Sequence, residues 1–266
     1  MPDRVNYDAI ASTYNRRFAE QRRSGTLQTL GKLVQAIGAE RVLEVGCGTG
    51  HWLAGLSNPA YQVYGLDFSM GMLAQAQQQE NALDLLQGRA EELPFPARSF
   101  DLVYCVNAIH HFQQQSDFIW QARRMLRPGG ALAVLGMDPH HRRNDWYVYE
   151  FFDGTFETDL ARFPSWGQML DWMIAAGFES MELRLAEEIG DPKYGPAVLD
   201  DPFLAKNACS QLALLSDQAY EEGLSRIRRA LAEAEAQGKV LVFQNTIQIH
   251  QLVGWVKANA TFPKNR

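Results

Sequence analysis

Residues 44–50 read EVGCGTG, in which three glycines alternate with other residues directly after the short apolar run RVL at 41–43. A glycine series between a strand and a helix permits positive φ and lets a ligand approach the main chain closely. We therefore predict a strand that ends here, a helix that begins after it, and a ligand against the turn. The alternative is that the glycines serve only a tight turn.

The spacing of the glycines limits which ligand fits. A dinucleotide-binding turn follows the pattern GxGxxG, but Gly46, Gly48 and Gly50 alternate and His51 stands where the last glycine is needed. No lysine followed by serine or threonine comes after the glycines, so a nucleoside triphosphate cradle is not indicated. A nucleoside-like ligand without phosphates fits this pattern better.

Two acidic residues suggest which nucleoside. Asp67 ends the strand-like run YQVYGLD, where a carboxylate can accept hydrogen bonds from both hydroxyls of a ribose. Glu44 comes just before the glycines, where a carboxylate suits an ammonium group directly or through a water. An adenosine with a cationic amino-acid tail is S-adenosylmethionine (SAM). The alternative for Asp67 is a simple helix cap before SMGML.

Composition narrows the function classes. The 266 residues carry a net charge of -6, which argues against a broad phosphate-binding face and against nucleic acid as a partner. No apolar run reaches the roughly 18 residues of a membrane helix, and the start MPDRVNYDAI lacks a secretory signal, so we expect a cytoplasmic protein without a membrane partner. Three cysteines without CxxC spacing predict neither a disulfide framework nor a metal site.

Strand-like and helix-like stretches alternate from about residue 40 to 138, which predicts a parallel sheet flanked by helices. The strand candidates are RVLEV, YQVYGLD, LDLLQG, FDLVYCV and GALAVLGMD, followed later by MELRL and by KVLVFQNTIQIHQLVGWV, which is one strand or two joined at QN. The helix candidates are 26–37, 50–56, 70–79, 112–126 and the capped run from Ser165 to Gly177.

The sequence after Asp138 changes character. The stretch 139–156 mixes histidines, arginines and aromatic residues without clean periodicity, so we expect a loop or cap there. We divide the chain into N-terminal helices that cover the cofactor site (1–39), a SAM-binding core (40–138), a cap segment with the sixth strand (139–189), a helical insertion (190–238) and the last strand with its tail (239–266).

Five ordered segments resemble the class I SAM-dependent methyltransferases, in particular the group similar to ubiquinone and menaquinone biosynthesis methyltransferases and to trans-aconitate methyltransferase (methyltransferase type 11 domain). These segments are EVGCGTG, VYGLDFSMGMLAQAQ, GRAEELPFPARSF, DLVYCVNAIHHF and MLRPGGALAVLGMD. The resemblance implies a Rossmann-like α/β fold with a seven-stranded sheet, mostly parallel with an antiparallel last strand, plus a helix-rich cap. It also implies methyl transfer from SAM to a small-molecule acceptor.

The resemblance carries cofactor roles onto this sequence. It places Glu44, Gly46, Cys47 and Gly48 along the methionine part, Asp67 on the ribose, and Phe68 beside the adenine with Met70 and Met72. Ala90 and Glu91 would meet the adenine edge, Val106 and Asn107 would lie under the reacting methyl, and Tyr14 would close over the cofactor from an N-terminal helix. Arg89 departs from the aspartate or asparagine of related sequences, and the Tyr7/Tyr14 stripe could instead be core packing.

For the acceptor we predict contacts from His111, Arg142, Trp146 and Tyr149, which follow the fourth and fifth strands. The alternatives are a structural histidine, a solvated basic turn and aromatic lid packing. No residue compels the assignment of a general base. The competing functions are a protein that binds SAM without turnover and, less favoured by the glycine spacing, a nicotinamide-dependent oxidoreductase.

Overall fold

Five short apolar runs form the parallel half of a β-sheet in the computed structural model, which describes residues 5–15, 24–78, 83–141 and 144–258. They are β1 (Arg41–Val45), β2 (Gln62–Asp67), β3 (Asp84–Gln87), β4 (Phe100–Val106) and β5 (Leu126–Gly136). Their order in the sheet is β3-β2-β1-β4-β5. β1 therefore pairs with β2 on one side and β4 on the other, and the order reverses there, where open α/β sheets bind ligands.

The antiparallel half of the sheet comes from the end of the chain. β10 (Asn245–Trp255) lies antiparallel between β5 and β7 (Ser180–Gly190), as the prediction of an antiparallel last strand requires. The two-residue β6 (Asp145–Trp146) pairs with the start of β10 and brings the sheet to eight strands instead of the seven expected. Gln244 separates β10 from β9 (Val242–Phe243), which pairs with β8 (Lys193–Tyr194) in a small second sheet.

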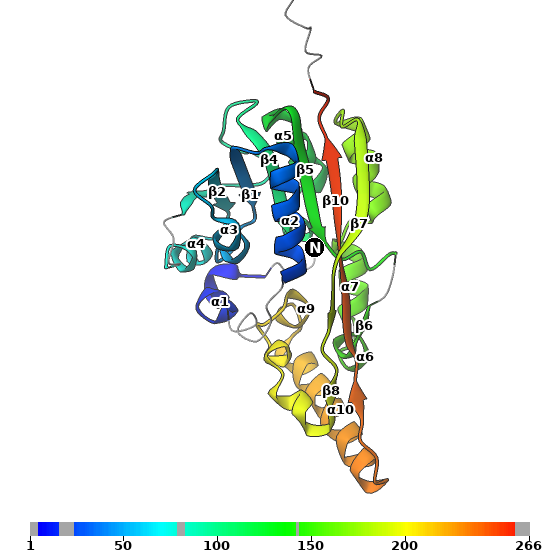
Figure 1. The fold of residues 1–266 in the computed structure, drawn as a ribbon. Coiled ribbons are helices and arrows are strands. Elements are labelled where there is room, and N and C mark those ends of the chain that lie inside the picture. The colour runs from blue at the N-terminus through cyan, green and yellow to red at the C-terminus, as the bar shows by residue number, and fades with distance from the viewer. Residues whose placement is uncertain (1–4, 16–23, 79–82, 142–143, 259–266) are drawn as a thin grey trace, which may run out of the picture.

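Helices cover both faces of the sheet because the central strands are apolar on both sides (Figure 1). On one face, α2 (Ser24–Ile37) and α3 (His51–Leu56) pack on alternate strand residues such as Val42 and Leu102. On the other face, α5 (Gln115–Met125) and α8 (Trp166–Ala175) pack on the residues between them, such as Leu43 and Val103. Ser165 caps α8 in a capping box with Gln168, as its sequence predicts.

The N-terminal helix α1 (Tyr7–Tyr14) lies on α4 (Met70–Ala76), the helix that follows β2. Ile10 and Ala11 bury their side chains against Met72. The Asp8 carboxylate accepts hydrogen bonds from the Ser69 hydroxyl (2.6 Å) and the Gly71 amide (2.7 Å), both at the start of α4. These donors hold the pKa of Asp8 below its usual range. The ionised carboxylate of Asp8 therefore joins α1 to α4 through two hydrogen bonds.

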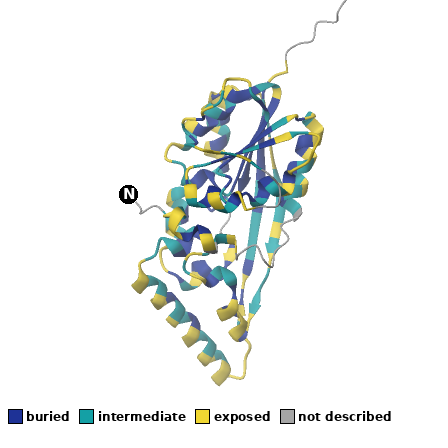
Figure 2. Cartoon of the chain, turned by 90° about the vertical axis from the view of Figure 1, so that its left-hand side faces the viewer, coloured by how far each residue is buried: buried dark blue, intermediate teal, exposed yellow. Residues whose placement is uncertain are grey.

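A helical cap, built from residues 145–243 apart from α8 and β7, hangs beyond the carboxyl ends of the parallel strands (Figure 1). Its elements are α6 (Tyr147–Phe151), α7 (Thr155–Arg162), two 3₁₀ turns η3 (Gly195–Asp200) and η4 (Pro202–Leu204), α9 (Ser210–Ala213) and α10 (Asp217–Ala236). An apolar cluster that includes Tyr147, Phe152 and Ile227 joins these elements. α10 turns one side to this cluster and leaves the other exposed (Figure 2).

The structure departs from the sequence predictions at three places. The aromatic stretch 145–151 forms a short strand and a helix, because its rings bury against α10 instead of following one periodic face. β5 begins at Leu126, earlier than the predicted start at Gly130. RPGG at 127–130 lies inside the strand, where the pairing with β4 is irregular. α2 packs on the face of the sheet, so of the two described N-terminal helices it is α1 that lines the cavity at the end where the strand order reverses.

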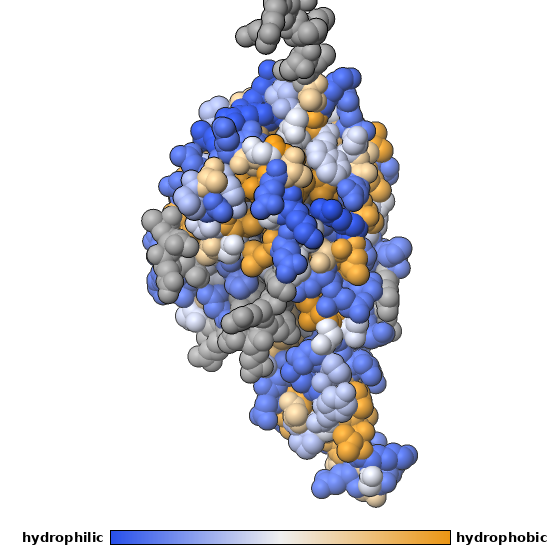
Figure 3. All heavy atoms as spheres, in the orientation of Figure 1, coloured by the Kyte–Doolittle hydropathy of each residue, from blue (hydrophilic) through white to orange (hydrophobic). Residues whose placement is uncertain are grey.

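The surface agrees with ordinary globular packing. Hydrophilic side chains dominate the face in Figure 3, with hydrophobic ones in small groups among them. Within the described ranges, no helix combines the length and the apolar character that crossing a membrane requires.

Two helix glycines test the packing of the cap. A Cβ at Gly223 in α10 would lie 2.2 Å from the buried Phe152 ring, whereas a Cβ at Gly31 in α2 would meet nothing within 4 Å. We expect Gly223→Ala to lower the free energy of unfolding by about 1–3 kcal/mol through overpacking. Gly31→Ala should raise it by about 0.8–1 kcal/mol through helix propensity. Urea denaturation measures both, and equal effects of the two changes would contradict the described contact of α10 with α6.

Candidate functional site

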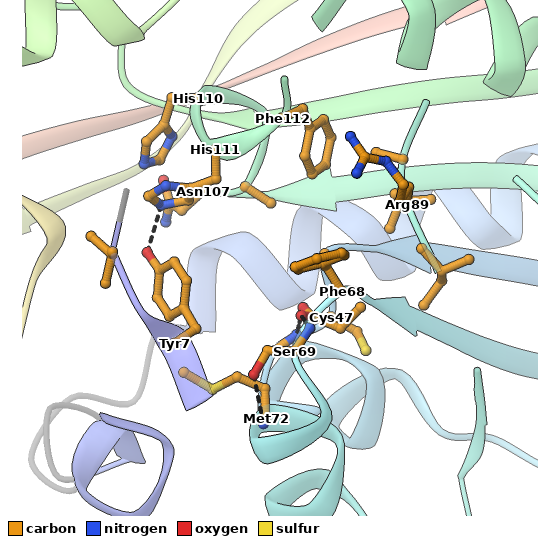
Figure 4. Close-up of a pocket in the computed structure, with 18 of the residues that line it drawn as sticks. Tyr7, Cys47, Phe68, Ser69, Met72, Arg89, Asn107, His110, His111 and Phe112 are labelled. Atoms are coloured by element: carbon orange, nitrogen blue, oxygen red, sulfur yellow. Dashed lines mark hydrogen bonds between the residues drawn. The ribbon is translucent and has the colours of Figure 1, made fainter. Parts of the chain in front are cut away.

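A cavity of about 650 Å³ opens at the carboxyl ends of the parallel strands, inside the range of roughly 300–1,000 Å³ that holds small ligands. The loops after β1, β2, β3 and β4 form its walls, α1 lies over one side, and the end of α7 reaches the other. Figure 4 shows the side chains that converge on it from these separate loops. Sequence elements far apart along the chain therefore meet around one ligand-sized space.

The three glycines of the loop after β1 do different work. All three have positive φ, between 54° and 74°. A Cβ at Gly46 would lie 2.6 Å from the Ala108 Cβ, and one at Gly50 would lie 3.0 Å from Leu83, so these two glycines are needed by protein packing. A Cβ at Gly48 would meet nothing within 4 Å, and Gly48 lines the cavity. Gly48 is thus the glycine at which a side chain would enter free space beside the cavity. Gly46 lines the cavity as well, but Ala108 already leaves no room for a side chain there, and packing alone accounts for Gly50.

Asp67 joins the loop after β1 to the loop after β2. One carboxylate oxygen accepts a hydrogen bond from the Gly48 amide (2.7 Å) and the other from the Ser69 amide (2.9 Å). Burial raises the pKa of Asp67, although these two amides oppose the shift. The carboxylate lines the cavity, so it is oriented before any ribose arrives.

The residues predicted to lie beside the adenine, Phe68, Ala90 and Glu91, all line the cavity, and so does Arg89. Phe68 is 67% exposed, and the Arg89 guanidinium lies 5.9 Å from the centre of its ring. Arg89 also bonds to Gln113 and pairs with Glu91 at 3.6 Å. Glu91 accepts from the Gln113 amide at 2.5 Å. The unexpected arginine is therefore fixed by a local network and leaves an open aromatic face.

Glu44 is not among the residues that line the cavity. Alternation along β1 turns its side chain toward the α2/α3 face, where it is fully buried and accepts from the Tyr104 hydroxyl at 3.0 Å. Burial raises the pKa of Glu44 well above its usual value. The prediction that Glu44 contacts an ammonium group directly does not match this geometry, because the carboxylate turns away from the cavity toward Tyr104.

The remaining cofactor candidates do reach the cavity. Cys47, Met72, Val106 and Asn107 line it, as does Tyr14, whose ring stands edge-on to Tyr7 at 5.9 Å. Asn107 directly follows β4 with φ +50°, a left-handed conformation that costs energy for a residue other than glycine. Such strain at the end of a strand, inside a cavity, is typical of a functional position.

The end of the cavity beyond Asn107 is polar. The Tyr7 hydroxyl lies 2.7 Å from His111 Nε2, which ties α1 to the turn η2 (Ile109–His111) across the cavity (Figure 4). His110 stacks on Phe163 with ring centres 3.8 Å apart. His111 therefore holds the position predicted for an acceptor contact, within reach of α1.

The other predicted acceptor residues lie elsewhere. Trp146 and Tyr149 are buried in the apolar cluster of the cap, and neither lines the cavity. Tyr149 donates to Asp159 at 2.7 Å, so its hydroxyl serves the interior of the cap. Arg142 falls outside the described residues. Their positions after β5 suggested the ligand side of the sheet, but the two rings pack edge-to-face on each other, and Tyr149 also packs on Phe156 of α7.

Sequence reasoning missed several cavity residues, because nothing local distinguishes them. Asp8 and Ser69 look like ordinary helix-start residues, and their bond appears only when α1 lies on α4. Arg162 ends α7 and reaches the cavity only through the fold of the cap. Among the described side chains, no group of three or more histidines, cysteines, aspartates or glutamates is placed to hold a metal ion.

Comparisons with known proteins agree with this site. Residues 43–134 match the family described as "Methyltransferase domain". A demethylmenaquinone methyltransferase of Oceanobacillus iheyensis is 26% identical over 67% of this chain and 84% of its own length. A phthiotriol/phenolphthiotriol dimycocerosates methyltransferase of Mycobacterium ulcerans is 35% identical over 48% of this chain and 45% of its own length.

The fold has solved counterparts as well. A crystal structure of a putative methyltransferase from an antibiotic biosynthesis pathway of Anabaena variabilis superposes with a TM-score of 0.65, at 21% identity, covering 87% of this chain and 98% of that one. The chain therefore contains a methyltransferase domain at residues 43–134 and has the Rossmann-like fold of methyltransferases, as the five segments predicted. It spans about half the length, or less, of several curated relatives that it matches.

The cofactor of this family is SAM, and the residues present fit it. Gly48 offers an open approach to the main chain, Asp67 offers an oriented carboxylate for a diol, and Phe68 offers an exposed aromatic face.

The first prediction for the site separates ligand approach from backbone strain. Gly48 and Gly38 both have positive φ (54° and 60°) and free space for a Cβ, but Gly38 ends α2 away from the cavity. We expect alanine at either position to cost about 1–2 kcal/mol of unfolding free energy. Gly48→Ala alone should weaken S-adenosylhomocysteine (SAH) binding at least tenfold in calorimetry. Equal binding by both variants would mean that no ligand approaches Gly48.

The second prediction concerns pH. If Asp67 binds the ribose as predicted, its ionised form accepts hydrogen bonds from both hydroxyls, and burial raises its pKa in the free protein. SAH affinity should therefore be constant at neutral pH and fall as the pH drops through this raised pKa, by up to about tenfold per pH unit for one proton. Asp67→Asn should bind more weakly and show a flat profile between pH 7 and 5. A variant that retained the wild-type acid dependence would exclude Asp67 as its source.

Proposed function

We propose that the chain transfers the methyl group of SAM to a small-molecule acceptor bound between Asn107, His111 and Tyr7. The observation that supports this most is the continuity of one cavity from Gly48 and Asp67 to the polar end at His111. A cofactor on the glycine loop and an acceptor near the histidines would share this space. The names of the relatives, which speak of a menaquinone precursor and of a lipid, also favour a small-molecule acceptor.

When bound, SAM supplies a methyl group already activated by the sulfonium. The chain then has to align the acceptor with that methyl group and exclude water, which can lower a barrier by about 7–11 kcal/mol in favourable cases. α1 suits the second task, since Asp8 clamps it to α4 and Tyr7 bonds across the cavity to His111. The cap closes the opposite side through the end of α7.

His111 is the cavity residue best suited to hold a proton from the acceptor. Its Nε2 shares a hydrogen bond with the Tyr7 hydroxyl, and imidazole titrates near neutral pH. A nucleophile that is already ionised would need no base. We therefore propose His111 as an acceptor contact that serves as a base only where the acceptor must lose a proton.

The cap is proposed to enclose the acceptor. Ala161 and Arg162 of α7 line the cavity, whereas no residue of 190–238 does so. The insertion supports α7 instead, through contacts such as the bond from Arg162 to Ser210 of α9 at 3.0 Å. The insertion therefore contributes to the enclosure of the acceptor indirectly, by holding α7 in place.

A labelled-methyl assay tests the function. Purified chain, methyl-labelled SAM and the small-molecule fraction of a cell extract should give label in that fraction together with SAH. Calorimetry on the same preparation should detect SAM and SAH but not NADH. Binding of SAM without any transfer of label would favour the alternative, a protein that binds SAM without turnover.

Asn107 provides the matched variants. Asn107→Gly removes the side chain while relieving the positive φ, so the unfolding free energy should stay equal or rise by up to about 1 kcal/mol. Label transfer should nevertheless fall at least tenfold. Arg98→Gly, at the other described non-glycine residue with positive φ (58°), lies outside the cavity and should leave the transfer unchanged. Full activity of Asn107→Gly would remove the Asn107 side chain from the acceptor site.

A further inference from the structure

Arg162 is a buried, positively charged residue in the wall of the cavity. Some of its N–H groups have no hydrogen-bond acceptor among the described residues. Its side chain is 10% exposed, and Nη2 donates to Asp159 (2.8 Å) and to Ser210 (3.0 Å). The Nε atom is enclosed, and among the described residues no oxygen accepts from it. Nη1 likewise donates to no other residue among those that the structure describes. Leaving buried donors unsatisfied is costly, so a purely structural arginine would be expected to use them.

Asp159 holds the arginine from the side of the cap. It is fully buried and accepts from Tyr149 (2.7 Å), Gln211 (2.7 Å) and Arg162. Its negative charge is therefore spread over three donors in the interior of the cap. This network fixes Nη2 on the side of the cap, while the Arg162 residue itself lines the cavity.

The other charged residues of the cavity wall already have partners. Asp67 is bonded to Gly48 and Ser69, Asp8 to Ser69 and Gly71, and Glu91 to the loop at Gln113. Arg89 is bonded to Gln113 and paired with Glu91 at the adenine end. Arg89 is 38% exposed, so water can satisfy its remaining N–H groups, whereas among the charged side chains of the described lining Arg162 is the one with a buried donor, Nε, that has no acceptor.

The position of Arg162 selects the acceptor end. The next residue, Phe163, stacks on His110 in the turn after β4. Gln115, at the start of α5, donates to the Arg162 carbonyl at 2.8 Å. Both contacts tie Arg162 to the elements that follow Asn107. Among the described residues, none of its hydrogen-bond partners belongs to the glycine loop or the loop after β2.

We propose that Arg162 recognises a carboxylate on the methyl acceptor, so that the acceptors of this chain are small organic acids. This inference rests on the proposed function, because it assigns a chemistry to the second ligand of the same cavity. A guanidinium matches a carboxylate through charge-assisted hydrogen bonds, and an enclosed site strengthens them. Asp159 is then a positioning residue that orients the arginine.

Matched acid and amide probes test the charge preference. Phenylacetate is compared with phenylacetamide, and octanoate with octanamide, by calorimetry on the full chain saturated with SAH. SAH occupies the cofactor end, so the probes report on the remaining space. We expect at least one acid to bind tenfold or more tightly than its amide. No preference for either acid, including no binding of either at millimolar concentration, overturns the inference.

Variants assign the preference to a residue. Arg162→Gln should reduce the acid-to-amide ratio to below twofold. Because this change leaves Asp159 buried without its counter-charge, the neutral pair Asp159→Asn/Arg162→Gln serves as a second form and should lose the preference equally. Arg226→Gln is the control, since Arg226 pairs with Asp153 in the same cap but does not line the cavity. It should keep the wild-type ratio, and a ratio that survives in both Arg162 variants overturns the assignment.

SAH affinity distinguishes the acceptor from the cofactor, which has a carboxylate of its own. Arg162→Gln should bind SAH within twofold of the wild type. A tenfold loss would assign Arg162 to the methionine carboxylate and overturn the proposal. Failure of the wild-type chain to bind SAH would overturn the proposed function together with this inference, whereas SAH binding without an acid preference overturns this inference alone.

Discussion

The bonds of Asp67 to the main chain organise the whole ligand side of this fold. One carboxylate takes amides from two loops, at Gly48 after β1 and at Ser69 after β2. Ser69 in turn donates to Asp8 of α1, so the chain of contacts runs from the centre of the sheet to the helix over the cavity. A single acidic residue thereby joins the glycine loop to the start of α4, and Ser69 extends the connection to the N-terminal helix. The burial of the Asp67 carboxylate follows from this central position.

The sequence predicted the sheet well because the signals there are local. Each parallel strand is a short apolar run bounded by turn residues, and the helices between them repeat with helical spacing. The ligand loops follow from the same reading, since carboxyl ends of parallel strands meet at one edge. On this basis the sequence could place four residues at the cavity, Gly48, Asp67, Phe68 and Asn107. Glu44 could not be placed in this way, because strand alternation decides the direction of a side chain and the family pattern says nothing of it.

The acceptor half resisted prediction for a physical reason. Trp146 and Tyr149 occupy the chain position of ligand contacts, but they are buried in an apolar cluster whose other members, such as Leu212 and Ile227, lie far along the chain. Arg162 carries no signal of its own, since an arginine near the end of a helix usually faces water. Its exposure, partners and access to the cavity are set by α9 and by the turn after β4. Long-range packing chose which side chains reach the second ligand.

The seating of α1 has a kinetic consequence. This helix is held by the two bonds of Asp8, a small apolar contact at Met72 and the Tyr7–His111 bond, whereas the sheet beneath it is fully interlocked. Of the cavity walls, α1 is therefore the one that can lift without disturbing the core. In the proposed function, spent cofactor would then exchange for fresh cofactor beneath α1. An affinity tag fused close to Tyr7 would therefore hinder the movement of α1, whereas a tag placed after Trp255 would not.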